Sequence, residues 1–157
     1  MKVSIISVIV TATTLAGCIS LSVPGRFSPV QGPLSKQSPV PPYTATMSGI
    51  LSGTISVVLD NGEVCKGSWV LVSKTAPDKS SSNSALINMA ADWDSVYGSG
   101  YHVAHVLGTK LYARATLTGT MGTVLHAELS NKKNTTGNTR GVAEDNKGNI
   151  FKVSVYN

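Results

Sequence analysis

The sequence contains few charged residues, few aromatic residues and only two cysteines. Lysine, arginine, aspartate and glutamate make up 13% of the 157 residues, and aromatic residues make up 6%. There is no glycine-rich phosphate loop and no G-x-S-x-G nucleophile motif. The net charge of +5 is not clustered enough to predict nucleic-acid binding. Abundant Ser, Thr, Asn and Gly instead favour a β-rich chain over a helical one.

The amino-terminal stretch lacks charge altogether. After Lys2, residues 3–15 ("VSIISVIVTATTL") contain no charged side chain. This run has about the length of the apolar core of a secretory signal peptide, and it is too short to span a bilayer comfortably. The alternatives are an ordinary secreted protein with a cysteine at the cleavage site by chance, or an internal apolar segment of a cytoplasmic protein.

The four residues that end this run, Leu15, Ala16, Gly17 and Cys18, resemble the lipobox of bacterial lipoproteins. The resemblance implies that Leu15, Ala16 and Gly17 are recognised by the signal peptidase, which cleaves between Gly17 and Cys18. It also implies diacylglycerol on the Cys18 thiol and a further acyl chain, such as palmitate, on the new amino terminus. Ile19, rather than aspartate, follows the cysteine, which implies the outer membrane. The membrane face stays open.

The second cysteine, Cys65, has no partner within the chain once Cys18 is acylated. On the predicted strand around it, Cys65, Trp69 and Leu71 share one face. The pattern favours a buried thiol that behaves as a small apolar residue, over a redox or cross-linking role.

Proline predicts the domain boundaries. We expect a signal peptide over residues 1–17, a lipidated cysteine with a proline-rich tether over 18–44, and one β-rich domain over 45–157. The tether lacks acidic residues, and as an extended chain it could reach roughly 80 Å. It contains six of the seven prolines, namely Pro24, Pro29, Pro33, Pro39, Pro41 and Pro42.

Three β-hairpins and one helix are predicted after the tether. Asn61-Gly62 is typical of a type I′ turn between two strands of alternating polarity. Two further hairpins turn at residues 119–122 and 146–148, and apolar residues at helical spacing predict a helix within residues 83–100. We therefore expect a mainly β, or β-rich α+β, fold: an antiparallel meander of about six or seven strands, curled into a small barrel or half-barrel, with one helix. A two-layer sheet covered by the helix is the alternative.

Three longer segments are similar to a group of uncharacterised proteobacterial outer-membrane lipoproteins. They are "NGEVCKGSW", "DSVYGSGYHVAHVLGTKLYARATLTG" and "GVAEDNKGNIFKV". This resemblance implies an envelope location and a single β-rich domain. It implies no catalytic residue.

Candidate catalytic and metal-binding groups are sparse. His102 and His105 would share a face only on a helix, and the adjacent glycines and β-branched residues favour a strand or irregular segment. Ser99, His102 and Asp94 are close in sequence but lack a nucleophile-elbow context. Asp92 and Asp94 point about 200° apart on a helix. We therefore predict no catalytic residue, no metal and no cofactor.

The candidate interaction surface combines aromatic and basic residues, namely Tyr97, Tyr101, His102, Lys132 and Lys133. The tyrosines could stack on a sugar or on a partner chain. Alternatively, they pack the helix against the sheet. The lysines belong to a basic rim that could attract an anionic polymer or lipid, or they lie on a solvated loop.

These features predict a lipid-anchored outer-membrane protein that is not an enzyme. We expect it to be an interaction or structural module with envelope protein partners, such as an accessory part of an envelope or secretion assembly. A binding module for a soluble ligand or a foreign enzyme is the alternative. An envelope hydrolase comes third.

Overall fold

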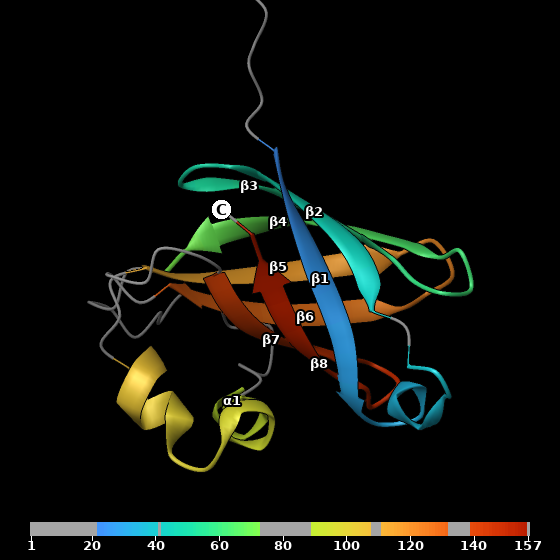
Figure 1. Cartoon of the computed structure of the whole chain (residues 1–157). Coiled ribbons are helices and arrows are strands. Elements are labelled where there is room, and N and C mark those ends of the chain that lie inside the picture. The colour runs from blue at the N-terminus through green and yellow to red at the C-terminus, as the bar shows by residue number, and fades with distance from the viewer. Residues whose placement is uncertain (1–21, 41, 73–88, 108–110, 132–138, 157) are drawn as a thin grey trace, which may run out of the picture.

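The computed structural model describes residues 22–40, 42–72, 89–107, 111–131 and 139–156. In this part of the chain, eight antiparallel strands follow one another around a closed barrel, and β8 pairs with β1 (Figure 1). The strands are β1 (Ser22–Gln31), β2 (Tyr43–Gly49), β3 (Ser52–Val58), β4 (Val64–Leu71), β5 (Leu111–Gly119), β6 (Val124–Asn131), β7 (Thr139–Asp145) and β8 (Ile150–Val155). The helical segments are η1 (Leu34–Lys36), α1 (Ala90–Tyr97) and η2 (His102–Val106).

The barrel is filled by its own side chains. Alternate residues of the strands point inward, among them Phe151, Val153 and Val155 on β8. The rings of Phe27 and Tyr43 each lie 6.2 Å from the Phe151 ring. An eight-stranded barrel is just wide enough for side chains to fill it, and each large apolar side chain buried here contributes roughly 1.5–3 kcal/mol.

The predicted β class and antiparallel meander are confirmed, and the barrel is the form that the meander takes. The strand count is eight rather than six or seven. The difference comes mainly from the proline-rich segment, which the sequence analysis assigned to the tether. Residues 22–31 are β1, and β2 begins at Tyr43, so the predicted spacer is wrong for these residues.

The two prolines of β1 fit a paired strand because of where the pairing stops. Consecutive residues of an antiparallel strand direct their backbone groups to opposite neighbours. Pairing with β2 ends at Phe27, two residues before Pro29, and pairing with β8 begins at Gly25, one residue after Pro24. The missing N–H of each proline therefore falls at the end of a ladder, and the Pro24 carbonyl still accepts a hydrogen bond from Tyr156 N–H (2.9 Å).

Three similar turns lie together at one end of the barrel, at the right of Figure 1. In the first, Leu59 N–H donates to the Glu63 carbonyl (2.9 Å), and Gly62 N–H donates to the Leu59 carbonyl (3.0 Å). Gly62 has a positive φ of 78°. This is a three-residue loop with a glycine bulge, not the two-residue type I′ turn that Asn61-Gly62 predicted. The turns of residues 119–123 and 145–149 repeat both hydrogen bonds.

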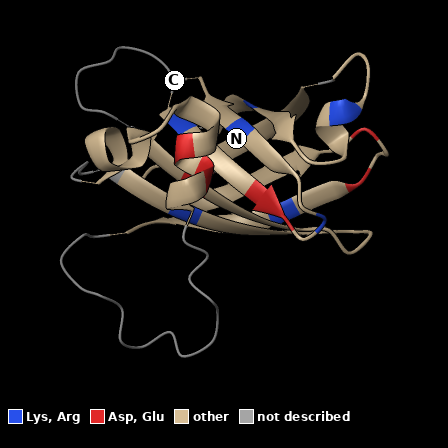
Figure 2. Cartoon of the chain, turned by 90° about the horizontal axis from the view of Figure 1, so that it is seen from below, with Lys and Arg blue, Asp and Glu red and all other residues tan. Residues whose placement is uncertain are grey.

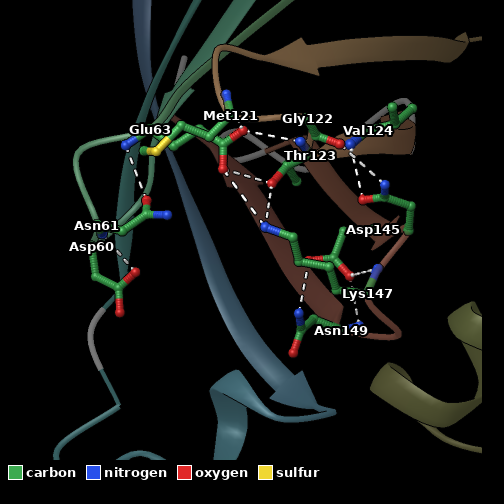
Figure 3. Close-up of polar contacts among 11 residues, drawn as sticks. Asp60, Asn61, Glu63, Met121, Gly122, Thr123, Val124, Asp145, Lys147 and Asn149 are labelled. Carbon is green, nitrogen blue, oxygen red and sulfur yellow. Dashed lines mark hydrogen bonds and ion pairs between the residues drawn. The ribbon is translucent and has the colours of Figure 1, made fainter.

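The residue after each turn glycine is polar and buried, and these residues are Glu63, Thr123 and Asn149. Glu63 Oε1 accepts hydrogen bonds from the backbone N–H groups of Met121 (2.9 Å) and Thr123 (3.0 Å), and Oε2 accepts from the Thr123 hydroxyl (2.6 Å) (Figure 3). The Lys147 ammonium lies 3.8 Å from Oε2. One carboxylate of the first turn thus holds the second turn and attracts the third.

The same polar layer ties η1 to this end of the barrel. Asp145 accepts hydrogen bonds from the Asn149 N–H (2.8 Å) and side-chain amide (2.7 Å). The Asn149 side-chain oxygen in turn accepts from Leu34 N–H (2.9 Å). Because these groups are buried and paired, the layer closes the barrel end while satisfying the polar atoms inside it.

Replacing Glu63 tests this layer. Glu63→Ala leaves the Met121 and Thr123 donors without their acceptor, so we expect a loss of about 3 kcal/mol or more in the free energy of unfolding, measured by urea titration. Asp60→Ala, at an exposed position in the same turn, should change it by no more than about 0.5 kcal/mol. Equal losses in the two variants would contradict this role.

The acid limb of the stability curve gives a second readout. The Thr123 hydroxyl, followed by the backbone donors and Lys147, outweighs burial and lowers the pKa of Glu63 from 4.5 to about 2. Because the folded pKa is lowered, the contribution of Glu63 is complete above pH 4.5 and is lost as the pH falls towards 2. The wild-type protein should therefore lose more stability over this window than Glu63→Ala does.

Candidate interaction surface

Helix α1 and the turn η2 cover part of the outer wall of the barrel, next to β7 and β8 (Figure 1). A second apolar cluster, distinct from the barrel interior, forms between them and the wall. It contains Met89, Trp93, Val106, Tyr112 and Val142. The helix therefore lies on the sheet, which is the alternative given for Tyr97 and Tyr101. Its described part begins at Ala90, and the predicted start near residue 83 lies outside the described residues.

Four rings at every fourth position form one cluster across α1 and η2, in which Trp93, Tyr97 and Tyr101 stack on one another and His105 is tilted against Tyr101. The Trp93 and Tyr97 ring centroids are 5.5 Å apart, those of Tyr97 and Tyr101 are 4.7 Å apart, and those of Tyr101 and His105 are 4.6 Å apart. We call these residues the aromatic ladder. Residues four apart face the same side of a helix, and Gly98, at a φ of 109°, ends α1 within the ladder. Trp93 is fully buried, whereas Tyr101 and His105 are half-buried.

Two cations from the barrel wall flank the ladder. The Arg140 guanidinium carbon lies 5.9 Å from the Tyr97 ring centroid, and Arg140 Nη1 donates to the Tyr101 hydroxyl (3.1 Å). The Lys152 ammonium lies 5.3 Å from the Tyr97 ring centroid. Burial raises the pKa of Tyr97 to about 12, so its hydroxyl stays protonated and donates towards the Gly141 carbonyl (3.2 Å). These contacts fix the ladder on β7 and β8.

A buried carboxylate holds the inner end of the ladder. Trp93 Nε1 donates to Glu128 Oε2 (3.0 Å). Glu128 Oε1 accepts from Arg114 Nε at 3.2 Å, and the same nitrogen lies 3.3 Å from the Tyr112 hydroxyl. The negative charge of Glu128 beneath the helix is thus compensated by Arg114 on the neighbouring strand β5.

The two aspartates of α1 lie in opposite environments. Burial, with the nearby charges of Glu144 and Glu128, raises the pKa of Asp92 to about 6. Asp94 instead accepts hydrogen bonds from the backbone N–H groups of His102 (2.9 Å) and Gly100 (3.1 Å), which lower its pKa. Asp94 therefore holds the connection between α1 and η2. Figure 2 shows acidic residues on α1, at the end of β7 and on the turn before β4.

The structure brings together three of the five predicted surface residues. Tyr97 and Tyr101 stack in the ladder, and His102 begins η2 beside them. Lys132 and Lys133 lie outside the described residues, as do Cys18 and the lipobox residues Leu15, Ala16 and Gly17. His105 and Lys152 were not among the predicted surface residues. The four-residue spacing from Trp93 to His105 was the available signal for the first of these.

The turn η2 corrects the expectation of a strand or irregular segment at residues 101–108. Residues 102–106 form a single π-helical turn, with the N–H of Leu107 donating to the His102 carbonyl (2.9 Å). His105 packs on Tyr101. Among the described residues, no three His, Cys, Asp or Glu side chains gather in a way that could hold a metal ion.

Ser99, His102 and Asp94 do not form a catalytic triad-like arrangement, because the Asp94 carboxylate is bound by backbone groups. Both carboxylate oxygens of Asp94 accept backbone N–H groups, one of them from His102 itself. Asp94 therefore stabilises the connection between α1 and η2.

The predicted burial of Cys65 is confirmed, because its side chain is fully enclosed in the barrel interior. Burial raises the pKa of the thiol to about 11, so the reactive thiolate is disfavoured at neutral pH.

Large aliphatic side chains are exposed beside the ladder. Val103 is 67% and Leu107 is 59% exposed on η2. Together with the half-buried Tyr101 and His105, they form what we call the η2 surface. It is apolar and aromatic, with Arg140 at its edge, and such a composition is typical of protein contact sites.

No protein-family model, curated protein or solved structure matches this chain. Within the part that the structure describes, none of the helices has the length and apolar character needed to cross a membrane.

The opposite pKa shifts of Asp92 and Asp94 predict that their substitution changes thermal stability in opposite directions at alkaline pH. Since the folded pKa of Asp92 is raised from 3.8 to about 6, its ionisation costs stability as the pH rises through this range. We expect Asp92→Asn to raise the thermal midpoint at about pH 8 and to leave it nearly unchanged at about pH 4.

Asp94→Asn provides the matched control on the same helix. The lowered pKa of Asp94 means that its charged form stabilises the fold, so this variant should lower the midpoint at about pH 8. Lower midpoints for both variants at this pH would contradict the proposed difference between the two sites.

Proposed function

We propose that the protein is a lipid-anchored outer-membrane protein whose barrel is a non-enzymatic interaction module, and that it serves as an accessory component of a multiprotein envelope or secretion assembly. The anchor in this proposal is Cys18, which follows the charge-free residues 3–15 and closes a lipobox-like tetrapeptide. The recognition surface is the η2 surface.

The observation that carries the proposal is the exposure of Val103 and Leu107 on a rigidly held turn. The stacked Tyr101 ring and the hydrogen bonds from Gly100 and His102 to Asp94 fix the backbone before Val103, and Leu107 N–H donates to the His102 carbonyl (2.9 Å). Little conformational entropy would be lost when a partner binds such a preorganised surface. Because side chains such as Phe27, Phe151 and Trp69 fill the barrel interior, a partner would bind on the outside of the barrel.

The aromatic and basic composition suits a protein partner. Tyrosine and arginine are enriched among residues that dominate binding energy, and here Arg140 Nη1 already contacts the Tyr101 hydroxyl. A partner that covers Val103 and Leu107 would also bury this pair and strengthen it by excluding water.

The test is a crosslinked pull-down from intact cells, followed by detergent solubilisation. We expect the wild-type protein to recover a fixed set of envelope proteins, and Val103→Arg to recover at least about tenfold less of them, because a charge would be buried at the contact. Val58→Arg is the matched control, since Val58 is a valine on the outer face of β3 with 48% exposure. It should leave recovery unchanged.

Cys18→Ala separates the anchor from the recognition surface. If recovery depends on the membrane location, this variant loses the partners in cells while the purified domain still binds them. Equal recovery by the wild-type protein and Val103→Arg would contradict recognition through η2. Recovery of a single soluble enzyme instead of envelope proteins would favour the alternative role of a binding module for a foreign enzyme.

A further inference from the structure

The turn that joins β2 to β3 carries two large aliphatic residues at its apex. Ile50 is 79% and Leu51 is 71% exposed. Tight hairpin turns favour glycine, asparagine or aspartate at such positions, and here Gly49, with a φ of 103°, supplies the unusual backbone conformation. Two adjacent exposed aliphatic side chains are therefore not explained by the geometry of the hairpin, and they indicate a contact surface.

The apex is held in a fixed position on the barrel. Trp69 Nε1 donates to the Ser48 carbonyl (2.8 Å), and Leu71 N–H donates to the Leu51 carbonyl (3.3 Å). Both bonds tie the turn to β4. Ile50 and Leu51 are consequently presented by a braced hairpin rather than by a loose loop.

This apex lies beside the point where the chain enters the barrel. Ser22, the first residue of β1, pairs with Ser48, which is two residues before Ile50. Cys18 is four residues before Ser22. Four residues span about 14 Å at most, so a lipid on Cys18 would hold this end of the barrel close to the bilayer surface.

Two further exposed residues lie at the same end. Val70 on β4 pairs with Ser52, directly after the apex, and is 50% exposed. Tyr156 is 37% exposed, and its N–H bonds to the Pro24 carbonyl near the start of β1. Tyrosine is enriched at membrane interfaces, where its ring is apolar and its hydroxyl reaches water.

The charge pattern of β1 and β2 suits an anionic lipid surface. From residue 18 to residue 59 the chain has no acidic residue, so nothing on β1, β2 or their neighbouring turn repels anionic lipid. At the opposite end of the barrel Asp60 is exposed, whereas Glu63 and Asp145 are buried.

We propose that the Ile50-Leu51 apex contacts the bilayer to which Cys18 is attached and inserts its two aliphatic side chains into the headgroup region. This inference rests on the proposed lipid anchor. One acylated residue would then hold the protein to the membrane, and the apex would set its orientation. The consequence is that the turn end of the barrel points away from the membrane.

The test uses the mature lipoprotein, purified in detergent and reconstituted into vesicles of phosphatidylethanolamine and phosphatidylglycerol. A nitroxide is attached at Leu51→Cys, and a matched nitroxide at Asp60→Cys reports on the opposite end of the barrel. Both positions are exposed, and the native Cys65 is enclosed in the core. The collision of each label with lipid-soluble oxygen and with a water-soluble nickel complex measures its depth.

We compare the acylated protein in vesicles with the unacylated Cys18→Ser protein in detergent-free buffer. We expect the label at residue 51 to be more accessible to oxygen in the vesicle-bound protein. The label at residue 60 should stay accessible to nickel in both samples. The mass of the amino-terminal peptide reports independently whether Cys18 is acylated.

The outcomes separate the inference from the proposal on which it rests. An acylated protein with equal nickel accessibility at residues 51 and 60 would overturn the membrane contact and leave the anchor intact. Shielding of residue 51 from both reagents would mean that a second copy of the chain covers the apex, which also overturns it. An unacylated Cys18 would overturn the anchor, and the inference with it.

Discussion

The pairing of β1 with both β2 and β8 is the constraint on which the rest of the structure depends. Without β1, the remaining seven strands would form an open sheet with two unpaired edges, and Phe27 would be missing from the interior. Closure also brings η1 onto the polar layer, where Asn149 accepts a hydrogen bond from Leu34. The proline-rich segment is therefore a structural part of the domain.

Closure also determines where function can be located. The interior is occupied by side chains, and the four most exposed large apolar side chains of the described residues lie outside it, two on η2 and two at the β2–β3 apex. Starting β1 at Ser22 replaces a long predicted tether by a connection of only a few residues after Cys18. In our account the domain stays near the membrane, and its partners must reach it there.

The sequence predicted the hairpins well because local signals specify them. Alternation on β8 and the glycines at residues 62, 122 and 148 predicted three hairpins that the structure confirms. It did not predict β1, because Pro24 and Pro29 are tolerated only where a neighbouring ladder happens to end, which is a tertiary property. The contact of Arg140 with the ladder was likewise unpredictable, since it joins residues 39 positions apart.

The most direct test of this account is the removal of β1 alone. Chains that begin at Ser22 and at Gly32 would be compared by thermal unfolding and by the dispersion of their amide NMR spectra. We predict a cooperative transition and dispersed amides for the longer chain, and their loss in the shorter one, because barrel closure and the Phe27 packing are removed. Equal thermal midpoints and matching spectra would show that residues 22–31 are a tether, and would contradict the account.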